Sequence, residues 1–373
     1  MAAAGAKFAY IDRMRGLAIL AVIWIHYSQA FASPAIHLIG MLGQLGVQLF
    51  FFASAITLCL SADHRAGEYY KGRNFILRRW LRIAPLYYLA IPCYAVYFAA
   101  RGEDAPYTPG NIMANVLFVH GFVRSANNNI VPGGWSVGVE MAFYVVFPAL
   151  YRMMERGWRQ RGGNALIVAV AGSLAVSGVY QLYVHHQAGT WLVNNSFGFF
   201  SFWVQQPVFV IGMAYYLAVL RGGAPPAPGT VWHERGLLIA GWGAAGAIVV
   251  LRYSPLAGMV PPLAALGYVG LSQLLRRGYL ERRWIEALGG VSYSLYIIHF
   301  AWVWGPGAEL VHSLNGDSWR EWAVLLPLFA AELLGLWLVA RIMWKVMEQP
   351  FANLASRLIS RWENSRKSAV ELV

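Results

Sequence analysis

Two ionisable residues, Arg15 and His26, lie in the first long apolar stretch of the chain, Met14–Phe31. A helix turns about 100° per residue, so residues eleven apart return to within about 20° of one face and lie about 16 Å apart along the axis. The spacing predicts that Arg15 and His26 share a helix face. An ionisable group inside an apolar span is costly and indicates function, although a hydrogen bond between helices is the alternative for His26. Asp12 lies three residues before Arg15, so the two can pair near the water boundary.

A carboxylate, Glu140, lies about one turn inside a later apolar stretch, Trp135–Tyr151, which also contains Ser136. Glu140 and Tyr144 are one turn apart and share a helix face. A carboxylate about one turn inside a span needs a partner or an aqueous cleft. If His26 faces Glu140, the two form a base with an orienting carboxylate, which is the arrangement that activates a hydroxyl group.

Three arginines, Arg78, Arg79 and Arg82, precede the apolar stretch Ile83–Ala100. Arg78 and Arg82 share a helix face at a spacing of four. Guanidinium groups match the geometry of phosphate and carboxylate, so the cluster suits a phosphorylated cofactor. The alternative is that these arginines only set the topology and contact lipid headgroups.

A polar stripe crosses the apolar stretch Ile285–Trp304. Ser292, Tyr296 and His299 fall on one helix face, and such stripes usually face the interior of a bundle. Tyr293 has an alternative place in an aromatic belt at the membrane surface.

Two further glutamates belong to the last apolar stretch, Trp322–Trp344, and to its end. Glu332 lies in the middle of the stretch, where an unpaired carboxylate is costly. Glu348 comes shortly before Pro350, which is expected to end the helix.

The composition defines the elements that must position these residues. Of 373 residues, 58% are hydrophobic and 12% are charged, whereas a soluble domain is usually about 25% charged. Apolar runs long enough to cross ~30 Å of hydrocarbon recur, without the alternation of a membrane barrel. The sequence therefore predicts an all-α polytopic membrane protein, a bundle of about ten transmembrane helices. The expected spans are Met14–Phe31, Ile36–Leu60, Ile83–Ala100, Trp135–Tyr151, Ala165–Val184, Ser196–Leu220, Gly236–Leu251, Leu256–Leu275, Ile285–Trp304 and Trp322–Trp344. The apolar piece Asn111–Val123 is too short to cross.

The lysines and arginines fall in alternate connections. Those on the side opposite the N-terminus are Arg101, Arg124, Arg252 and Arg320, and the other 25 of the 29 share the N-terminal side. The positive-inside rule then predicts that both termini are cytoplasmic. This placement also explains the net charge of +12 without a nucleic-acid partner. We expect a membrane domain over residues 1–351 and a short cytoplasmic tail over 352–373.

The sequence lacks the motifs of several common kinds of site. The two cysteines, Cys59 and Cys93, both lie in apolar stretches and form neither a disulfide framework nor a metal-ligand pattern. No Walker loop, dinucleotide fingerprint, HExxH or GxSxG motif occurs. No bound metal is predicted.

Taken together, these motifs resemble the integral-membrane acyltransferase-three family, bacterial enzymes that O-acylate polysaccharides, lipopolysaccharide and some macrolides. The matching stretches are Asp12–Gly16 with His26, Leu49–Ser54, Arg78–Pro85, Trp135–Glu140 through Phe147 and Pro148, Ser292–Tyr296 with His299, and Glu348–Pro350. The chain departs from the family at Ser54-Ala55, where Ser-Gly is usual, and it resembles a stand-alone member.

The resemblance implies transfer of an acyl group, typically acetyl from acetyl-CoA, to a sugar hydroxyl at the bacterial cytoplasmic (inner) membrane. Arg15, Arg78, Arg79 and Arg82 match positions associated with the donor, His26 matches the essential histidine, and Glu140 matches the conserved glutamate. The expected partners are acyl-CoA, a polysaccharide or lipid-linked sugar, and membrane lipids. Homo-oligomerisation stays open.

Two mechanisms fit this resemblance. His26 either deprotonates the sugar hydroxyl, with Glu140 fixing its tautomer, or becomes transiently acylated. We favour the base. A small secreted metabolite such as a macrolide is the alternative acceptor, and a proton-coupled transporter or flippase is the alternative class of protein, because it too would hold polar groups inside spans.

Overall fold

The computed structural model describes residues 9–103, 106–193, 195–221, 241–242, 245–246, 256–314 and 318–371, and throughout these residues the regular structure is helical. This confirms the predicted all-α fold. The elements are α2 (Ala9–Ser28), α3 (Pro34–Gly40), η1 (Met41–Leu45), α4 (Gly46–His64), α5 (Lys71–Ala100), α6 (Pro109–Val116), η2 (His120–Phe122), α7 (Gly134–Arg161), α8 (Gly163–Ala188), α9 (Phe202–Tyr215), η3 (Tyr216–Leu220), η4 (Ala257–Met259), α11 (Val260–Arg276), α12 (Arg283–Gly290), α13 (Ser292–Val303), α14 (Pro306–Leu314), α15 (Ser318–Met343), η5 (Trp344–Glu348) and α16 (Gln349–Glu371).

In the part of the chain that is described, seven helices are long and apolar enough to cross a membrane by length and composition. The chain is therefore an integral membrane protein. The sequence predicted about ten spans, and the difference has three sources. α2 carries charged residues in its first turns, most of the expected span Gly236–Leu251 lies outside the described residues, and the expected span Ile285–Trp304 is not one helix.

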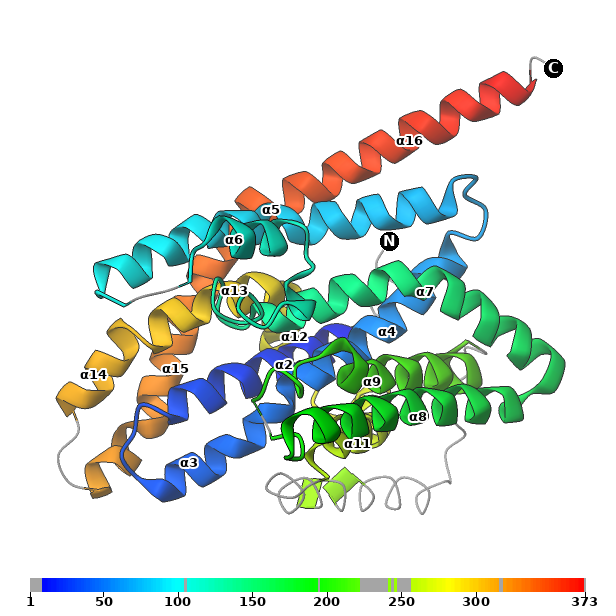
Figure 1. The fold of residues 1–373 in the computed structure, drawn as a ribbon. Helices are drawn as coiled ribbons and strands as arrows, with labels where there is room; N and C mark the ends of the chain where they lie inside the picture. Colours follow the sequence, from blue (N-terminus) through cyan, green and yellow to red (C-terminus); the bar gives the residue numbers. More distant parts are fainter. Residues whose placement is uncertain are drawn as a thin grey trace.

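α2 runs through the middle of the bundle and contacts α4, α11, α12 and α13 (Figure 1). At its contact with α12 the two backbones come very close together. A Cβ atom added at Gly16 would lie 2.0 Å from the Ile285 carbonyl oxygen, and one added at Gly289 would lie 1.9 Å from the Asp12 carbonyl oxygen. Small residues let two membrane helices approach this closely. The contact fixes the end of α2 that carries Arg15.

The expected span Ile285–Trp304 was wrong as a single helix. It is divided at Val291, whose φ of −117° and ψ of 17° leave the helical region. Gly289 and Gly290 precede the break, and glycine has a low helix propensity. As a result, α13 has its own direction and carries the polar stripe toward α2.

The expectation that Pro350 ends the last span was also wrong. The chain continues from α15 through the π-helical turn η5 into α16 (Figure 1). Proline lacks an N–H and its ring clashes with the carbonyl four residues earlier, and a π turn is one way for a helix to absorb such a local mismatch. α16 packs along α5, where Glu363 accepts hydrogen bonds from the backbone N–H groups of Tyr69 and Tyr70 and from the Asn74 amide.

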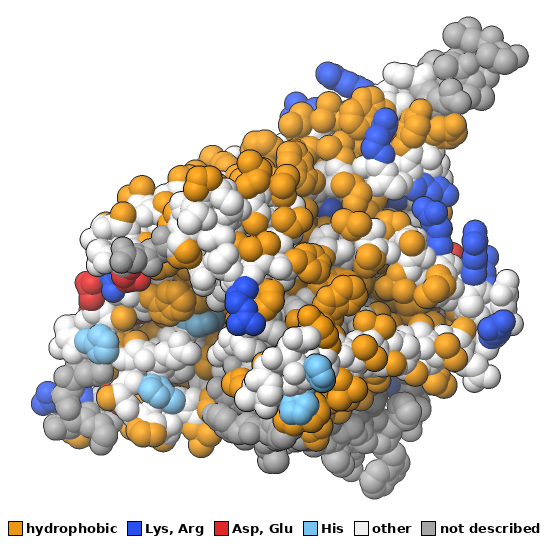
Figure 2. Space-filling view, in the orientation of Figure 1, with side chains coloured by type: hydrophobic (Ala, Val, Ile, Leu, Met, Phe, Trp, Pro, Cys, Tyr) orange, Lys and Arg blue, Asp and Glu red, His pale blue; other side chains and the backbone are white. Residues whose placement is uncertain are grey.

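Charged side chains are unevenly distributed over the face shown in Figure 2. Lys and Arg side chains gather at the end where α5 begins and where α7 and α16 finish, and acidic side chains appear near the opposite end. This distribution agrees with the bias counted in the sequence. The orientation of the termini across a membrane stays a prediction.

Candidate active site

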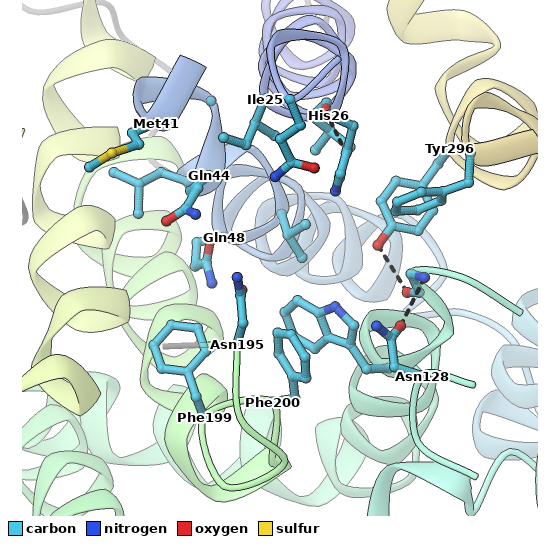
Figure 3. A pocket seen from close by; sticks show the side chains of 18 of the residues that line it. Ile25, His26, Met41, Gln44, Gln48, Asn128, Asn195, Phe199, Phe200 and Tyr296 are labelled. Atoms are coloured by element: carbon cyan, nitrogen blue, oxygen red, sulfur yellow. Dashed lines mark hydrogen bonds between the residues drawn. The ribbon is translucent and has the colours of Figure 1, made fainter. Parts of the chain in front are cut away.

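Two adjoining cavities lie in the bundle. The larger one, which we call the His26 cavity, has a volume of about 310 Å³. Its lining combines aromatic and amide side chains with one histidine: His26, Gln29, Gln44, Gln48, Asn128, Trp135, Asn195, Phe199, Phe200, Tyr296, Phe300 and Trp304. Figure 3 shows His26 and Tyr296 on one side of this cavity, opposite Gln44, Gln48 and Asn195.

The His26 ring is held in one orientation. Its Nδ1 lies 2.8 Å from the Val22 carbonyl oxygen, one turn earlier on α2. A carbonyl oxygen can only accept, so Nδ1 carries the hydrogen and Nε2 carries the lone pair. The rings of Phe300 and Trp304 pack against the imidazole, with centroids at 4.4 and 6.2 Å. The arrangement presents an unprotonated nitrogen to the cavity, as a general base requires.

His299 is the side chain that pairs with His26. It is fully buried on α13, and its Nε2 lies 3.3 Å from His26 Nδ1. The polar stripe predicts that His299 faces the interior of the bundle, and its burial confirms this. The pairing itself links residues 273 positions apart, and no sequence spacing could have indicated it.

The smaller cavity, which we call the arginine cavity, has a volume of about 80 Å³. Its charged lining residues are Arg15, Arg79, Arg82 and Glu140, and the rest of the lining includes Phe50, Ser54, Ser136, Tyr144, Ser292 and Tyr293. Glu140 accepts hydrogen bonds from Ser54 Oγ and, at 2.6 Å, from the Tyr144 hydroxyl. Three guanidinium groups facing one carboxylate leave an excess of positive charge, which favours an anionic ligand.

Two contacts that the sequence allowed are not made. Glu140 does not meet His26, because each lines a different cavity and bonds to other partners. Asp12 and Arg15 do not form a close ion pair. Arg15 instead donates to Thr57 Oγ1 at 3.2 Å, and Asp12 interacts with it at longer range.

Arg78 lies apart from the other arginines of its cluster. It forms two hydrogen bonds of 2.8 Å to the carboxylate of Glu68, while Arg79 and Arg82 line the arginine cavity. A spacing of four puts Arg78 and Arg82 near one helix face. In the bundle, however, Arg79 and Arg82 are the two that face the cavity. Sequence reasoning could not separate the three.

Val47 and Tyr296 line both cavities, and together they form the dividing wall between them. The Tyr296 hydroxyl donates to the Gly133 carbonyl oxygen at 2.9 Å and accepts from Ser136 Oγ at 2.8 Å. Figure 3 shows the bond from Tyr296 together with the neighbouring bond to Asn128. The wall is therefore tied to the start of α7.

Of the remaining predicted residues, Trp135 lines the His26 cavity and Tyr293 lines the arginine cavity, whereas Glu348 and Glu332 line neither. The Trp135 ring stacks on Phe200 with centroids 4.3 Å apart, and the Tyr293 hydroxyl donates to the Ile83 carbonyl oxygen at 2.8 Å. Glu348 is buried and accepts a hydrogen bond from Ser294. Glu332 is buried beside the Trp302 side chain, away from both cavities.

Asn128 and Asn195 were missed by sequence reasoning. Both lie in irregular segments outside the apolar spans, where periodicity carries no signal. The run Asn127-Asn128-Asn129 was the available hint, since such amide clusters are unusual in an apolar chain. In the described part of the chain, no group of His, Cys, Asp and Glu side chains is arranged to hold a metal ion.

The fold and the cavities define a helical membrane protein with a histidine and an arginine cluster in adjoining buried spaces. A family model described as an acyltransferase domain matches residues 8–341. The chain belongs to this family, the acyltransferase-three family, as its motifs indicated.

Two characterised relatives match most of the chain. The acyltransferase MdmB of Streptomyces mycarofaciens is 26% identical over 375 residues, which cover 92% of this chain and 91% of the relative. The exopolysaccharide production protein ExoZ of Rhizobium meliloti (strain 1021) is 26% identical over 270 residues, 69% of this chain and 76% of the relative. No solved structure gives a significant match.

Proposed function

We propose that the protein transfers an acetyl group from acetyl-CoA to a hydroxyl of an envelope or extracellular polysaccharide sugar. The observation that carries this proposal is that the arginine cavity and the His26 cavity share one wall, Val47 and Tyr296. An acyl group that crosses this wall moves from a cationic pocket to a neutral base. Membership of an acyltransferase family supports the reaction class.

The arginine cavity suits the donor. CoA carries phosphate groups, and charge-assisted hydrogen bonds from guanidinium groups are among the strongest that bind phosphate. Arg79 and Arg82 lie in the first half of α5, and α5 begins at the basic end of the bundle. With the phosphates held there, the thin pantetheine arm extends past Glu140 toward the wall.

The His26 cavity suits a hydroxyl-rich acceptor. Amide side chains form hydrogen bonds with hydroxyl groups, and the aromatic rings offer apolar surface for the faces of a sugar. Gln48 is 2% exposed, and its Oε1 has no hydrogen-bond partner. A buried acceptor without a partner is costly, and an acceptor hydroxyl would satisfy it. The name of the relative ExoZ is consistent with a polysaccharide.

The reaction then proceeds at His26. Nε2 removes the hydroxyl proton while the sugar oxygen attacks the thioester carbonyl carbon, and the C–S bond breaks to release CoA thiolate. The proton on His26 then passes to that thiolate or to water. Glu140 stays in the arginine cavity, where it balances part of the positive charge.

The test is an assay of purified protein with radiolabelled acetyl-CoA and a panel of sugar acceptors, following CoA release, acceptor labelling and label bound to protein. We expect His26→Ala to abolish acceptor labelling and His186→Ala to retain it, because His186 is exposed on α8, outside both cavities. Label that accumulates on the wild-type protein would favour an acyl-histidine route over the base.

Equal CoA release by wild type and His26→Ala would contradict the proposal. Thermal stabilisation by a solute alone, with no effect of CoA, would favour the transporter instead. Labelling of a small metabolite and of no sugar would reassign the acceptor.

A further inference from the structure

We infer that His299 is the positioning residue for His26, in the place where many histidine bases have a carboxylate. This rests on the proposed function of His26 as a base. The observation behind it is the contact between His299 Nε2 and His26 Nδ1 at 3.3 Å, formed between α13 and α2.

The backbone fixes the tautomer of both rings. His26 Nδ1 faces the Val22 carbonyl oxygen at 2.8 Å, and His299 Nδ1 faces the Tyr296 carbonyl oxygen at 2.7 Å. Each Nδ1 must therefore carry a hydrogen, and each Nε2 must be an acceptor when the ring is neutral. His26 Nδ1–H is then shared between the Val22 oxygen and the lone pair of His299 Nε2.

This geometry favours the transition state over the resting state. When His26 Nε2 takes a proton from the acceptor hydroxyl, the ring becomes an imidazolium and its Nδ1–H becomes a stronger donor. A bond to His299 Nε2 strengthens as that charge forms, and such differential interactions lower the barrier to reaction. His299 accepts without being charged itself, so no carboxylate has to be buried beside the cavity.

The packing around His299 and the positions of the nearby carboxylates support its role as the acceptor for His26. Its side chain is fully buried, and the ring of Phe300 packs against both imidazoles, with centroids at 4.4 Å from His26 and 4.0 Å from His299. Glu140, the carboxylate that the sequence suggested as the partner of His26, lies in the arginine cavity. Another carboxylate near α13, Glu348, is bonded to Ser294.

Two substitutions separate positioning from packing. In His299→Gln, the amide oxygen can reach the place of Nε2, so the acceptor for His26 is kept while the bond to Tyr296 is lost. In His299→Asn, the shorter amide reaches only the place of Nδ1, so the bond to the Tyr296 carbonyl is kept while the acceptor is lost. Both variants have similar polarity and leave similar space.

We expect His299→Asn to lower kcat about 10- to 100-fold, less than the roughly 10²- to 10⁴-fold that a general base itself contributes, with the KM values for acetyl-CoA and acceptor changed by less than about twofold. His299→Gln should retain most of kcat. Thermal unfolding in detergent, measured for both variants, shows whether each one folds.

The opposite order, with His299→Asn as active as wild type and His299→Gln impaired, would overturn the inference, because the bond to Tyr296 would then be what matters. Equal and full activity of both variants would overturn it as well. Loss of activity in His26→Ala alongside either result leaves the proposed function intact, whereas an active His26→Ala removes the proposed function itself.

Discussion

Arg78 and Arg82 illustrate how two identical side chains four residues apart acquire different partners. Arg82 lines the arginine cavity with Arg15 and Arg79, whereas Arg78 is bound at both of its terminal nitrogens by Glu68. A guanidinium group already paired with a carboxylate has little left to offer a phosphate. The two residues form a matched pair for testing the donor site.

Arg82→Ala is expected to raise the KM for acetyl-CoA about 10- to 100-fold, the equivalent of losing one or two charge-assisted hydrogen bonds. Arg78→Ala should change this KM by less than about twofold, because its bonds to Glu68 do not involve the cavity. Initial rates measured against acetyl-CoA concentration check both. Equal effects of the two substitutions would mean that the arginines act only through the general field at this end of the bundle.

At the scale of elements, the crossing of α2 and α12 controls the position of Arg15. Gly16 and Gly289 bring the two backbones together, and neither position has room for a side chain. Gly290 is adjacent in sequence, but a Cβ added there would meet nothing within 4 Å. Gly289 is therefore a position where a side chain does not fit, and Gly290 is a neighbouring position that serves as its control.

Gly289→Ala should destabilise the protein by about 1–3 kcal/mol, the usual cost of overpacking a close contact, and should also weaken acetyl-CoA binding by shifting Arg15. Gly290→Ala should be close to neutral, or slightly stabilising, since alanine favours a helix more than glycine does. Denaturant and thermal unfolding in detergent measure the difference. If both variants unfold alike, the close approach of α2 and α12 does not hold the site.

Helix type and most spans could be predicted from the sequence, because apolar runs of membrane length have few alternatives. The shared face of Arg15 and His26 followed from helical geometry alone. The break at Val291 and the passage of α15 into α16 could not be predicted. A glycine pair precedes the first and Pro350 lies at the second, and packing against neighbouring helices decides whether the helix breaks or continues at each. The pairing of His26 with His299 rather than Glu140 depends on the relative rotation of α2, α7 and α13, which only packing sets.

At the scale of the whole molecule, the charge distribution defines two ends. Lys and Arg gather where α5 begins and α16 finishes (Figure 2), and the first half of α5 supplies Arg79 and Arg82 to the arginine cavity. If the basic end is cytoplasmic, acetyl-CoA has direct access to its proposed site, and the His26 cavity lies toward the outside.

Cysteine labelling tests this orientation. In a Cys93→Ala background, Ser365→Cys on α16 and Ser313→Cys on α14 place thiols at exposed positions on opposite ends. A membrane-impermeant maleimide applied to intact spheroplasts should label Ser313→Cys and spare Ser365→Cys until the membrane is permeabilised. The reverse pattern would invert the topology, and labelling of both in intact cells would show that the two ends are not on opposite sides.

The dividing wall of Val47 and Tyr296 has a consequence for the membrane itself. Two polar cavities end to end would form a water-filled pore, and a pore through a bilayer conducts protons and dissipates the gradient on which the cell depends. The bonds of Tyr296 to Gly133 and Ser136 hold the ring across this route. In the proposed reaction, the side chain that lets an uncharged acyl group pass would also keep the two cavities from joining into a path for protons.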